Sequence, residues 1–327
     1  MPVISYIEAV KQALDEEMAH NDKVFILGED VGMKGGVFKA TEGLYEKYGK
    51  ERVIDTPLAE SGIVGVGIGA AMYGMRPIAE IQFADFIMPA VNQIVSEAAK
   101  IRYRSNNDWH CPITIRAPYG GGVNGGLYHS QSVEALFANV PGLKIVMPST
   151  PYDVKGLLKS AIRDDDPVLF FEHKRAYRLI KEEVPEQEYT IPIGKADVKR
   201  EGEDVTVITY GLAVHFALQA ADKLQEEGIS VHVLDLRTVY PLDKEAIIEA
   251  ASKTGKILLV TEANKEGSII SEVSAIIAEY CLFDLDAPVQ RLAGPDVPAM
   301  PYAAPLEKHF MINSDKIEQA LRDLAYF

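Results

Sequence analysis

A single carboxylate, Glu60, stands where a very apolar helix is expected to begin. It lies in the run Asp55-Thr-Pro-Leu-Ala-Glu-Ser-Gly62, and the glycine-rich stretch at 62–72 that follows carries no charged side chain. A Glu at this place either interacts with the positive end of the helix dipole or is held, largely without water, to exchange a proton with a bound ligand. The second interpretation predicts a catalyst.

The glycines of this helix raise the question of a nucleotide site. Gly62, Gly65, Gly67 and Gly69 lie inside an apolar helix, and their order does not match the GxGxxG turn of a dinucleotide-binding protein. The alternative is that these glycines allow close packing against a neighbouring element. A GxxxxGK[ST] motif is also absent. The pattern therefore argues against a Rossmann oxidoreductase, which NAD binding would test, and against nucleotide hydrolysis.

A second candidate site is a glycine-rich loop that ends at a histidine. Residues 120–126 contain five glycines in seven positions, directly after an expected strand, and His129 follows them. Loops at the carboxyl ends of strands carry the sites of α/β proteins, and glycine lets a backbone approach a ligand closely. A single histidine is more often a structural residue, but His129 at this place could also transfer a proton.

The third cluster is Ile81-Gln-Phe-Ala-Asp-Phe86, at the end of another expected strand. Phe86 could stack on a planar heterocycle while Gln82 offers it an amide, although aromatic residues at such places belong to the core in most proteins. The motifs HExxH and GxSxG are absent, as is any pair of cysteines at metal-ligand spacing. Zinc-dependent and serine hydrolases are therefore excluded.

Composition describes an ordinary globular protein of two domains. The chain has 327 residues, 47% hydrophobic and 25% charged, and single cores seldom grow beyond about 250–300 residues. A net charge of −15 argues against nucleic-acid binding, which needs basic surfaces. No apolar run reaches the roughly 18 residues of a membrane span. Cys111 and Cys281 lie far apart and no targeting signal is visible, so we expect a cytoplasmic, prokaryotic protein.

Strand-like runs alternate with helical patterns along the chain, which predicts α/β architecture with parallel sheets covered by helices on both faces. The expected strands are 24–27, 78–83, 113–116, 144–147, 168–171, 205–210, 231–235 and 257–261. Capping chemistry predicts helix starts at Ser5 and Thr150, and residues 84–104 are long enough for one buried helix. An acidic connector at 182–194 places the boundary near residue 190, between domains at 1–190 and 191–327.

Six ordered motifs extend along the chain. They are Leu27-Gly-Glu-Asp-Val-Gly32, Gly35-Gly-Val-Phe-Lys-Ala-Thr-Glu-Gly-Leu44, Asp55-Thr-Pro-Leu-Ala-Glu-Ser-Gly62, Pro148-Ser-Thr-Pro-Tyr152, Asp235-Leu-Arg-Thr238 and Tyr240-Pro-Leu-Asp243. Together they resemble the β subunits of the thiamine-diphosphate-dependent 2-oxo acid dehydrogenases, and the resemblance covers nearly the whole chain. It implies two doubly wound α/β domains, a pyrimidine-binding domain followed by a transketolase-like C-terminal domain.

The resemblance implies a shared active site. In this family the α subunit of an α2β2 heterotetramer holds the diphosphate and Mg2+ through a GDG…N motif, which this chain lacks. By residue match, Glu60 would contact N1′ of the aminopyrimidine and so promote loss of the thiazolium C2 proton. Phe86 would stack on the pyrimidine, and Leu58 and Gln82 would also line the cofactor. Apolar neighbours suit Glu60, because desolvation favours sharing a proton over ionisation.

The resemblance also assigns roles outside the pyrimidine site. His129 matches the family's proton donor in reductive acylation of the lipoyl domain of the dihydrolipoyl acyltransferase core. Asn124 stands where relatives often have a second histidine, so the role of that histidine in orienting the substrate or the lipoyl arm is open here. A monovalent-cation site, with K+ as a candidate ion, is implied mainly through backbone carbonyls at Ile113, Thr114, Ala161, Asp164 and Asp166.

Finer motifs at 81–90, 96–105 and 127–132 look more like the branched-chain enzymes, so 3-methyl-2-oxobutanoate and its homologues are the expected 2-oxo acid substrates. A pyruvate (or acetoin) dehydrogenase β subunit is the alternative, because a pocket separates such chains by only about 1–3 kcal/mol per methylene. A more distant alternative is a non-catalytic subunit that docks the acyltransferase core. The net negative charge of the chain and the acidic segment Phe283-Asp-Leu-Asp286 suit binding of a basic partner domain.

Overall fold

The computed structural model describes all residues from Met1 to Phe327, which form two units. Unit 1 comprises Met1–Tyr119 and Leu136–Ile193, and unit 2 comprises Gly120–Ala135 and Gly194–Phe327. The glycine-rich loop and His129 therefore belong to unit 2, although strands of unit 1 precede and follow them in the chain. The predicted boundary near residue 190 lies close to the last passage of the chain between the units, at Ile193 and Gly194.

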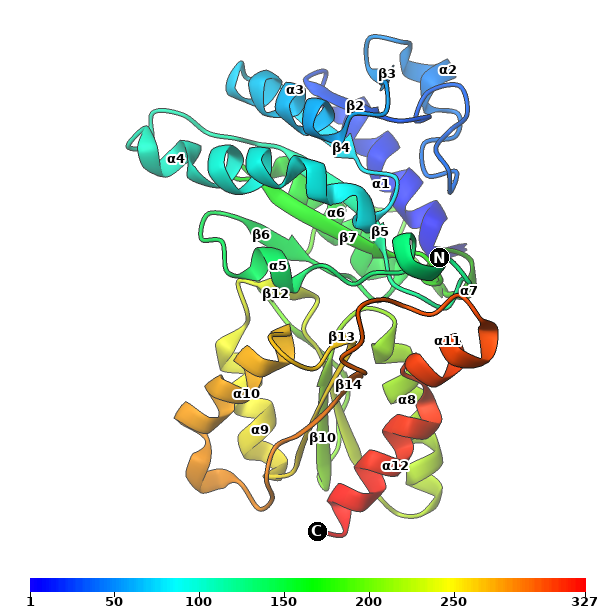
Figure 1. Cartoon of the computed structure of the whole chain (residues 1–327), viewed down its shortest axis with the longest axis vertical. Coiled ribbons are helices and arrows are strands. Elements are labelled where there is room, and N and C mark those ends of the chain that lie inside the picture. Colours follow the sequence, from blue (N-terminus) through cyan, green and yellow to red (C-terminus); the bar gives the residue numbers. More distant parts are fainter. The chain divides into compact units, whose positions relative to one another are not determined.

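Unit 1 is built on a parallel sheet (Figure 1). Its strands are β2 (Val24–Gly28), β3 (Val53–Asp55), β4 (Arg76–Glu80), β5 (Thr114–Tyr119), β6 (Lys144–Val146) and β7 (Val168–His173). They lie in the order β6-β7-β5-β4-β2-β3, and every pair among them is parallel. Most residues of these strands are buried, as expected for a parallel sheet between helical layers.

Helices cover this sheet, and two of their starts follow the predicted capping chemistry. The helices are α1 (Tyr6–His20), α2 (Leu44–Tyr48), α3 (Glu60–Met72), α5 (Ala135–Ala138), α6 (Pro151–Arg163) and α7 (Ala176–Leu179). Two short strands, β1 (Val3–Ser5) and β8 (Lys181–Glu183), pair antiparallel in a separate sheet. The Ser5 hydroxyl accepts from the Glu8 N–H, and the Glu8 carboxylate accepts from the Ser5 N–H at 2.7 Å. The Thr150 hydroxyl accepts from the Asp153 N–H at 3.1 Å. Both predicted helix starts are confirmed.

The predicted continuous helix over 84–104 is wrong in detail. The segment is helical but divided into η1 (Ala84–Ala90), η2 (Asn92–Glu97), η3 (Ala98–Lys100) and α4 (Ile101–Arg104), with 3-10 and π turns. Pro89 in η1 has no N–H to donate. The backbone at Ala99 packs closely on Gly142. A Cβ added at Gly142 would lie 2.0 Å from the Ala99 carbonyl oxygen. Tertiary packing therefore interrupts the α-helical repeat.

Unit 2 contains a mixed sheet. Its strands are β9 (Asp197–Arg200), β10 (Val205–Thr209), β11 (Val231–Asp235), β13 (Ile257–Asn264) and β14 (Gln290–Gly294), in the order β14-β13-β10-β11-β9. The predicted parallel pairing is found among β10, β11, β13 and β14, whereas β9, a strand that was not predicted, runs antiparallel to β11 at one edge. β9 connects to β10 through residues 201–204 without a helix, which suits an antiparallel strand, and β10 is parallel to β11.

Helices lie on both faces of the unit 2 sheet (Figure 1). The elements are η4 (Gly126–Tyr128), α8 (Ala213–Glu226), β12 (Thr238–Tyr240), α9 (Lys244–Thr254), α10 (Ile269–Tyr280), η5 (Leu282–Asp284), α11 (Ala304–Phe310) and α12 (Ser314–Ala325). One face carries α9 packed on α10, and the other carries α8 packed on α12. Both units thus have the layered α/β architecture that the alternating pattern predicts.

The chain's helices are all too short or too polar to cross a bilayer. Both cysteines are buried free thiols. Burial raises the pKa of Cys111 to about 12, so this thiol stays protonated near neutral pH and is a poor nucleophile.

Candidate functional site

Glu60 is the first residue of α3, and only 8% of it is exposed. The helix that carries it approaches the sheet closely at Gly67, where a Cβ would lie 2.7 Å from Cδ1 of Ile113. Gly69, in contrast, faces open space. Close packing therefore accounts for Gly67 but not for every glycine of the helix. The same packing places the N-terminus of α3, with its positive dipole end and the Glu60 carboxylate, at one end of the sheet.

A second carboxylate, Glu29, lies beside Glu60. It follows the end of β2, is 8% exposed, and its Oε1 is buried without a hydrogen-bond partner. Burial raises the pKa of Glu29, and the negative charges of Glu60 and Asp30 raise it further. Two carboxyl groups in one poorly hydrated place favour sharing of protons. Glu29 was not among the predicted site residues, although an acid directly after a buried strand is a recognisable signal.

Gln82 is adjacent to this carboxylate pair. Its Nε2 donates to the backbone oxygen of Glu29 at 3.4 Å and to Oδ2 of Asp30 at 3.5 Å, both long hydrogen bonds. The hydroxyl of Thr56, which lies just after β3, is buried without a partner, and the Thr56 N–H donates to the oxygen of Gly28 at 2.9 Å. Glu60, Glu29, Gln82 and Thr56 therefore occupy one end of the unit 1 sheet, where α/β proteins bind ligands.

Phe86 and Leu58 differ in their surroundings. Phe86 lies in η1 and packs edge-on against Phe83, with ring centroids 5.6 Å apart. The Nζ of Lys174 lies over the ring of Phe83, 5.6 Å from its centre, so Phe83 makes a cation–π contact as well as its contact with Phe86. Leu58 is 78% exposed. As placed in unit 1, this apolar side chain lacks protein cover and suits contact with a ligand or another chain.

The buried polar oxygens of this end of the sheet fit a nitrogen heterocycle. Glu29 Oε1 and Thr56 Oγ1 find no partner in the chain, and buried polar atoms are normally hydrogen-bonded. An aminopyrimidine offers ring nitrogens and an amino group to such atoms. The donor set here is therefore compatible with the pyrimidine half of thiamine diphosphate. No group of three or more His, Cys, Asp or Glu side chains that could hold a metal ion occurs in the chain.

A charged cluster beneath this end of the sheet was not predicted. Arg116 of β5 is fully buried and contacts Glu80 of β4 at 2.6 Å and Glu172 of β7 at 2.6 Å and 2.8 Å. The Tyr177 hydroxyl donates to Glu172 at 2.6 Å. Burial raises the pKa of Glu80 although Arg116 opposes the shift. Burial alone would lower the pKa of Arg116, but the charges of Glu172 and Glu80 raise it overall. The cluster joins three neighbouring strands.

The predicted monovalent-cation residues surround a turn after α6 that already holds cationic side chains. Lys144 Nζ contacts both oxygens of Asp164 at 2.6 Å and 2.7 Å, and Arg76 donates to the Asp164 carbonyl at 2.9 Å. Arg102 contacts Asp166 at 2.5 Å. The carbonyls of Ile113 and Ala161 accept backbone N–H groups, and the Thr114 side chain is buried. Both Asp carboxylates thus already have cationic partners, and a bound cation would depend on backbone carbonyls, each of which keeps a second lone pair.

His129 belongs to unit 2, whereas Glu60 belongs to unit 1. It follows η4, and its side chain is half-buried between the exposed Tyr128 and the buried Ser130. The tip of the loop is exposed at Val123 and Leu127, while the backbone on either side of it is held by hydrogen bonds, such as that from the Gly120 N–H to the Gln131 oxygen at 3.1 Å. An accessible imidazole on an anchored loop is suited to proton transfer.

Comparison with known proteins bears on both units. Residues 3–180 match the family "Transketolase, pyrimidine binding domain", and residues 194–317 match "Transketolase, C-terminal domain". The chain is 78% identical over its 327 residues to the 2-oxoisovalerate dehydrogenase subunit beta of Bacillus subtilis (strain 168), covering 100% of both chains. It is 48% identical over 326 residues to the pyruvate dehydrogenase E1 component subunit beta of the same strain, again with 100% of both chains covered.

A solved structure shares the fold. The protein described as "Split gene transketolase, inactive beta4 tetramer" superposes with a TM-score of 0.80 and 24% sequence identity, covering 99% of this chain and 98% of that one. The two matched domains follow one another in the order that the motifs imply, and the full-length relatives are subunits of 2-oxo acid dehydrogenases. The chain therefore belongs to the family of 2-oxo acid dehydrogenase β subunits, which consist of a transketolase pyrimidine-binding domain and a transketolase C-terminal domain.

Proposed function

We propose that this chain is the β subunit of a branched-chain 2-oxo acid dehydrogenase and that it works with an α subunit in an α2β2 heterotetramer. The reaction is oxidative decarboxylation of a 2-oxo acid with reductive acylation of a lipoyl group on the dihydrolipoyl acyltransferase. The observation that supports catalysis most directly is the buried pair of Glu60 and Glu29 beside Gln82. A subunit that only docked other proteins would not need two poorly hydrated carboxyl groups at a sheet edge.

Thiamine diphosphate, when bound, supplies the carbon nucleophile and the electron sink that decarboxylation of a 2-oxo acid requires. In our proposal Glu60 holds a proton at N1′ of the pyrimidine. Glu29 lies beside Glu60, and burial and the charge of Glu60 raise the pKa of Glu29, which favours its sharing a proton in this site. Gln82 orients the ring by its amide, and Phe86 and Leu58 exclude water from its faces.

The diphosphate and Mg2+ are assigned to the α subunit in this proposal, because this chain lacks the GDG…N motif with which the family holds them. The K+ site stays a prediction from the resemblance alone, and the cytoplasmic location stays a prediction from cysteine usage and from the absence of a visible targeting signal. The exposed residues Leu282 and Phe283, the latter 100% exposed, favour a docking role for unit 2 that would operate alongside catalysis. The acyltransferase core is the partner that we propose for this surface.

We infer the substrate from the 2-oxoisovalerate dehydrogenase subunit, which is 78% identical to this chain, rather than from the pyruvate dehydrogenase subunit, which is 48% identical. We expect the enzyme reconstituted with its α subunit, thiamine diphosphate and Mg2+ to prefer 3-methyl-2-oxobutanoate over pyruvate by 10-fold or more in kcat/KM, since two extra methyl groups in a matching pocket contribute about 1–3 kcal/mol each. Initial rates with both acids at several concentrations measure this ratio. Equal or inverted values would favour the pyruvate or acetoin alternative, and an inactive assembly would favour the docking subunit.

His129 is expected to act in the second half-reaction. Replacing it with Ala should slow reductive acylation of a lipoyl domain by about 10²- to 10⁴-fold, the usual contribution of a positioned general acid. Decarboxylation measured with a dye as artificial electron acceptor should stay within about threefold of the wild type. Replacement of the surface residue His20, which ends α1, is the matched control. Equal loss in both assays would contradict this assignment.

A further inference from the structure

The loop that leads to His129 is held by two carboxylates of unit 2. Oε1 of Glu307, on α11, accepts from the Gly122 N–H at 3.0 Å and from the Asn124 N–H at 3.1 Å. Oε1 of Glu262, on β13, accepts from the Gly121 N–H at 2.5 Å. Glu307 is only 5% exposed. Three backbone donors within four residues are therefore satisfied by acidic side chains that lie more than a hundred positions away in the sequence.

The shape of the loop backbone explains why carboxylates fit there. Gly120, Gly122, Asn124 and Gly126 all have positive φ values, +88°, +77°, +56° and +65°. Left-handed residues spaced in this way turn successive N–H groups to one side and create a concave anion site. Asn is one of the few side chains that tolerates such a conformation. The anion in this site is the carboxylate of Glu307, so hydrogen bonds hold the loop against α11.

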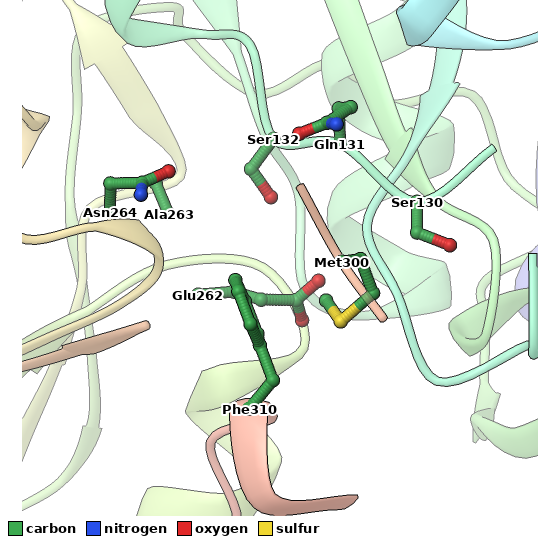
Figure 2. A pocket seen from close by; sticks show the side chains of 8 residues that line it. All are labelled: Ser130, Gln131, Ser132, Glu262, Ala263, Asn264, Met300 and Phe310. Atoms are coloured by element: carbon green, nitrogen blue, oxygen red, sulfur yellow. The ribbon is translucent and has the colours of Figure 1, made fainter. Parts of the chain in front are cut away.

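Packing behind the loop leaves little freedom at its start. A Cβ at Gly121 would lie 2.5 Å from Cε of Met300 and 2.9 Å from Sδ of Met311. A small pocket adjoins this contact (Figure 2). It is lined on one side by Ser130, Gln131 and Ser132, which follow His129, and on the other by Glu262, Ala263, Asn264, Met300 and Phe310. The residues on both sides of His129 thus lie over the same region of unit 2.

The far end of the segment is anchored as well. Glu134 is buried, and its carboxylate accepts from the Tyr210 hydroxyl at 2.7 Å. That hydroxyl is also 2.7 Å from the Thr261 hydroxyl. Burial raises the pKa of Glu134, with the Tyr210 hydrogen bond opposing and the charge of Glu262 adding to the shift. Acidic side chains therefore secure the loop both before and after His129.

We propose that Glu307 is a positioning residue for His129. It touches no reacting atom, and it acts by fixing the backbone at Gly122 and Asn124 so that the imidazole keeps one position relative to the rest of unit 2. Charge-assisted hydrogen bonds are stronger than neutral ones, and a displacement of about 1 Å at a catalytic group can cost about 10²-fold in rate. This inference rests on the proposed function, in which His129 serves reductive acylation.

The test compares the two half-reactions in the holoenzyme reconstituted with the α subunit, thiamine diphosphate and Mg2+. Glu307→Ala removes the acceptor, and we expect reductive acylation of the lipoyl domain to fall by about 10- to 100-fold. Dye-coupled decarboxylation should stay within about twofold. Glu307→Gln keeps an oxygen that can accept both N–H groups, so reductive acylation should be largely rescued. Asp315→Ala, which removes an exposed carboxylate on α12, is the matched control for loss of charge.

Hydrogen exchange provides a second readout that does not depend on activity. The amides of 120–129 should exchange faster in Glu307→Ala than in the wild type or in Glu307→Gln. If the Ala variant does not assemble, Glu307→Asp serves instead, since it withdraws the carboxylate by one methylene and should give the same split between half-reactions with a smaller loss. Equal losses in both half-reactions, no loss in either, or unchanged exchange of the loop would overturn the proposal.

His129→Ala, measured in parallel, separates this inference from the proposed function. If His129→Ala loses reductive acylation while Glu307→Ala retains it, the positioning role of Glu307 is wrong and the proposed function stands. If His129→Ala retains reductive acylation, the assignment of His129 is wrong. In that case faster exchange of 120–129 in Glu307→Ala would still establish the anchor, but its catalytic role would be overturned.

Discussion

Glu60→Gln is expected to lower the rate of decarboxylation by about 10²- to 10⁴-fold in the reconstituted enzyme, the range in which general acid–base groups contribute. The amide has nearly the shape of the carboxylate but cannot hold or release a proton at N1′. It also removes the negative charge that raises the pKa of Glu29. The loss should therefore appear in kcat, with both half-reactions affected because decarboxylation precedes acyl transfer.

The control for this substitution is Glu46→Gln, the same change at an exposed residue of α2, which should leave the rate unchanged. Size-exclusion chromatography with the α subunit reports assembly, and titration calorimetry reports binding of thiamine diphosphate. We expect an intact heterotetramer for both variants. Full decarboxylation by an assembled Glu60→Gln enzyme would remove the central assignment and favour a subunit that only docks its partners.

Arg116→Met is expected to destabilise unit 1 by about 3–5 kcal/mol, because it leaves Glu80 and Glu172 buried without their shared partner. The Arg side chain is fully buried and lies within 2.8 Å of both carboxylates. For a unit of this size such a loss corresponds to a fall of roughly 6–20 °C in the midpoint of thermal unfolding. Scanning calorimetry of the purified chain measures it directly.

Two further variants decide whether the effect comes from uncompensated charge. Arg104→Met breaks an exposed ion pair with Glu97, whose atoms are 3.1 Å apart, and should change stability by no more than about 1 kcal/mol. Adding Glu80→Gln and Glu172→Gln to Arg116→Met removes the isolated charges and should restore part of the stability. If the triple variant is less stable than Arg116→Met, lost packing rather than unpaired charge explains the effect.

Several elements could be predicted because their signals are local. Ser5 and Glu8 form a capping box within four residues, and Thr150 caps the helix that Pro151 begins. Buried strands appear as short runs rich in β-branched residues, continuous at 205–209 and with two valines at 231–235, where β10 and β11 were found. Glu60 at the start of α3 was expected from the contrast between one charge and an apolar helix, and the structure places it there, buried.

Other features depend on contacts between distant segments, for which a single sequence carries no local mark. The division of 84–104 into short helices follows from packing of Ala99 on Gly142. The antiparallel position of β9 depends on its pairing with β11. The pairing of Arg116 with Glu80 and Glu172 needs three strands to be neighbours in the order β7-β5-β4, an order that differs from their order in the chain.

The kinds of chemistry in this chain, a buried acid at a helix start, a glycine loop with a histidine, and two α/β patterns, were readable from residue types, because caps, hydrophobic periodicity and left-handed turns act over a few neighbouring residues. Folding determined which other residues became the neighbours of these groups. Glu29 became the neighbour of Glu60, and the loop of His129 joined unit 2 through Glu262 and Glu307. Such pairings arise when distant segments share one layer of a sheet, and their energies depend on burial that exists only in the folded chain.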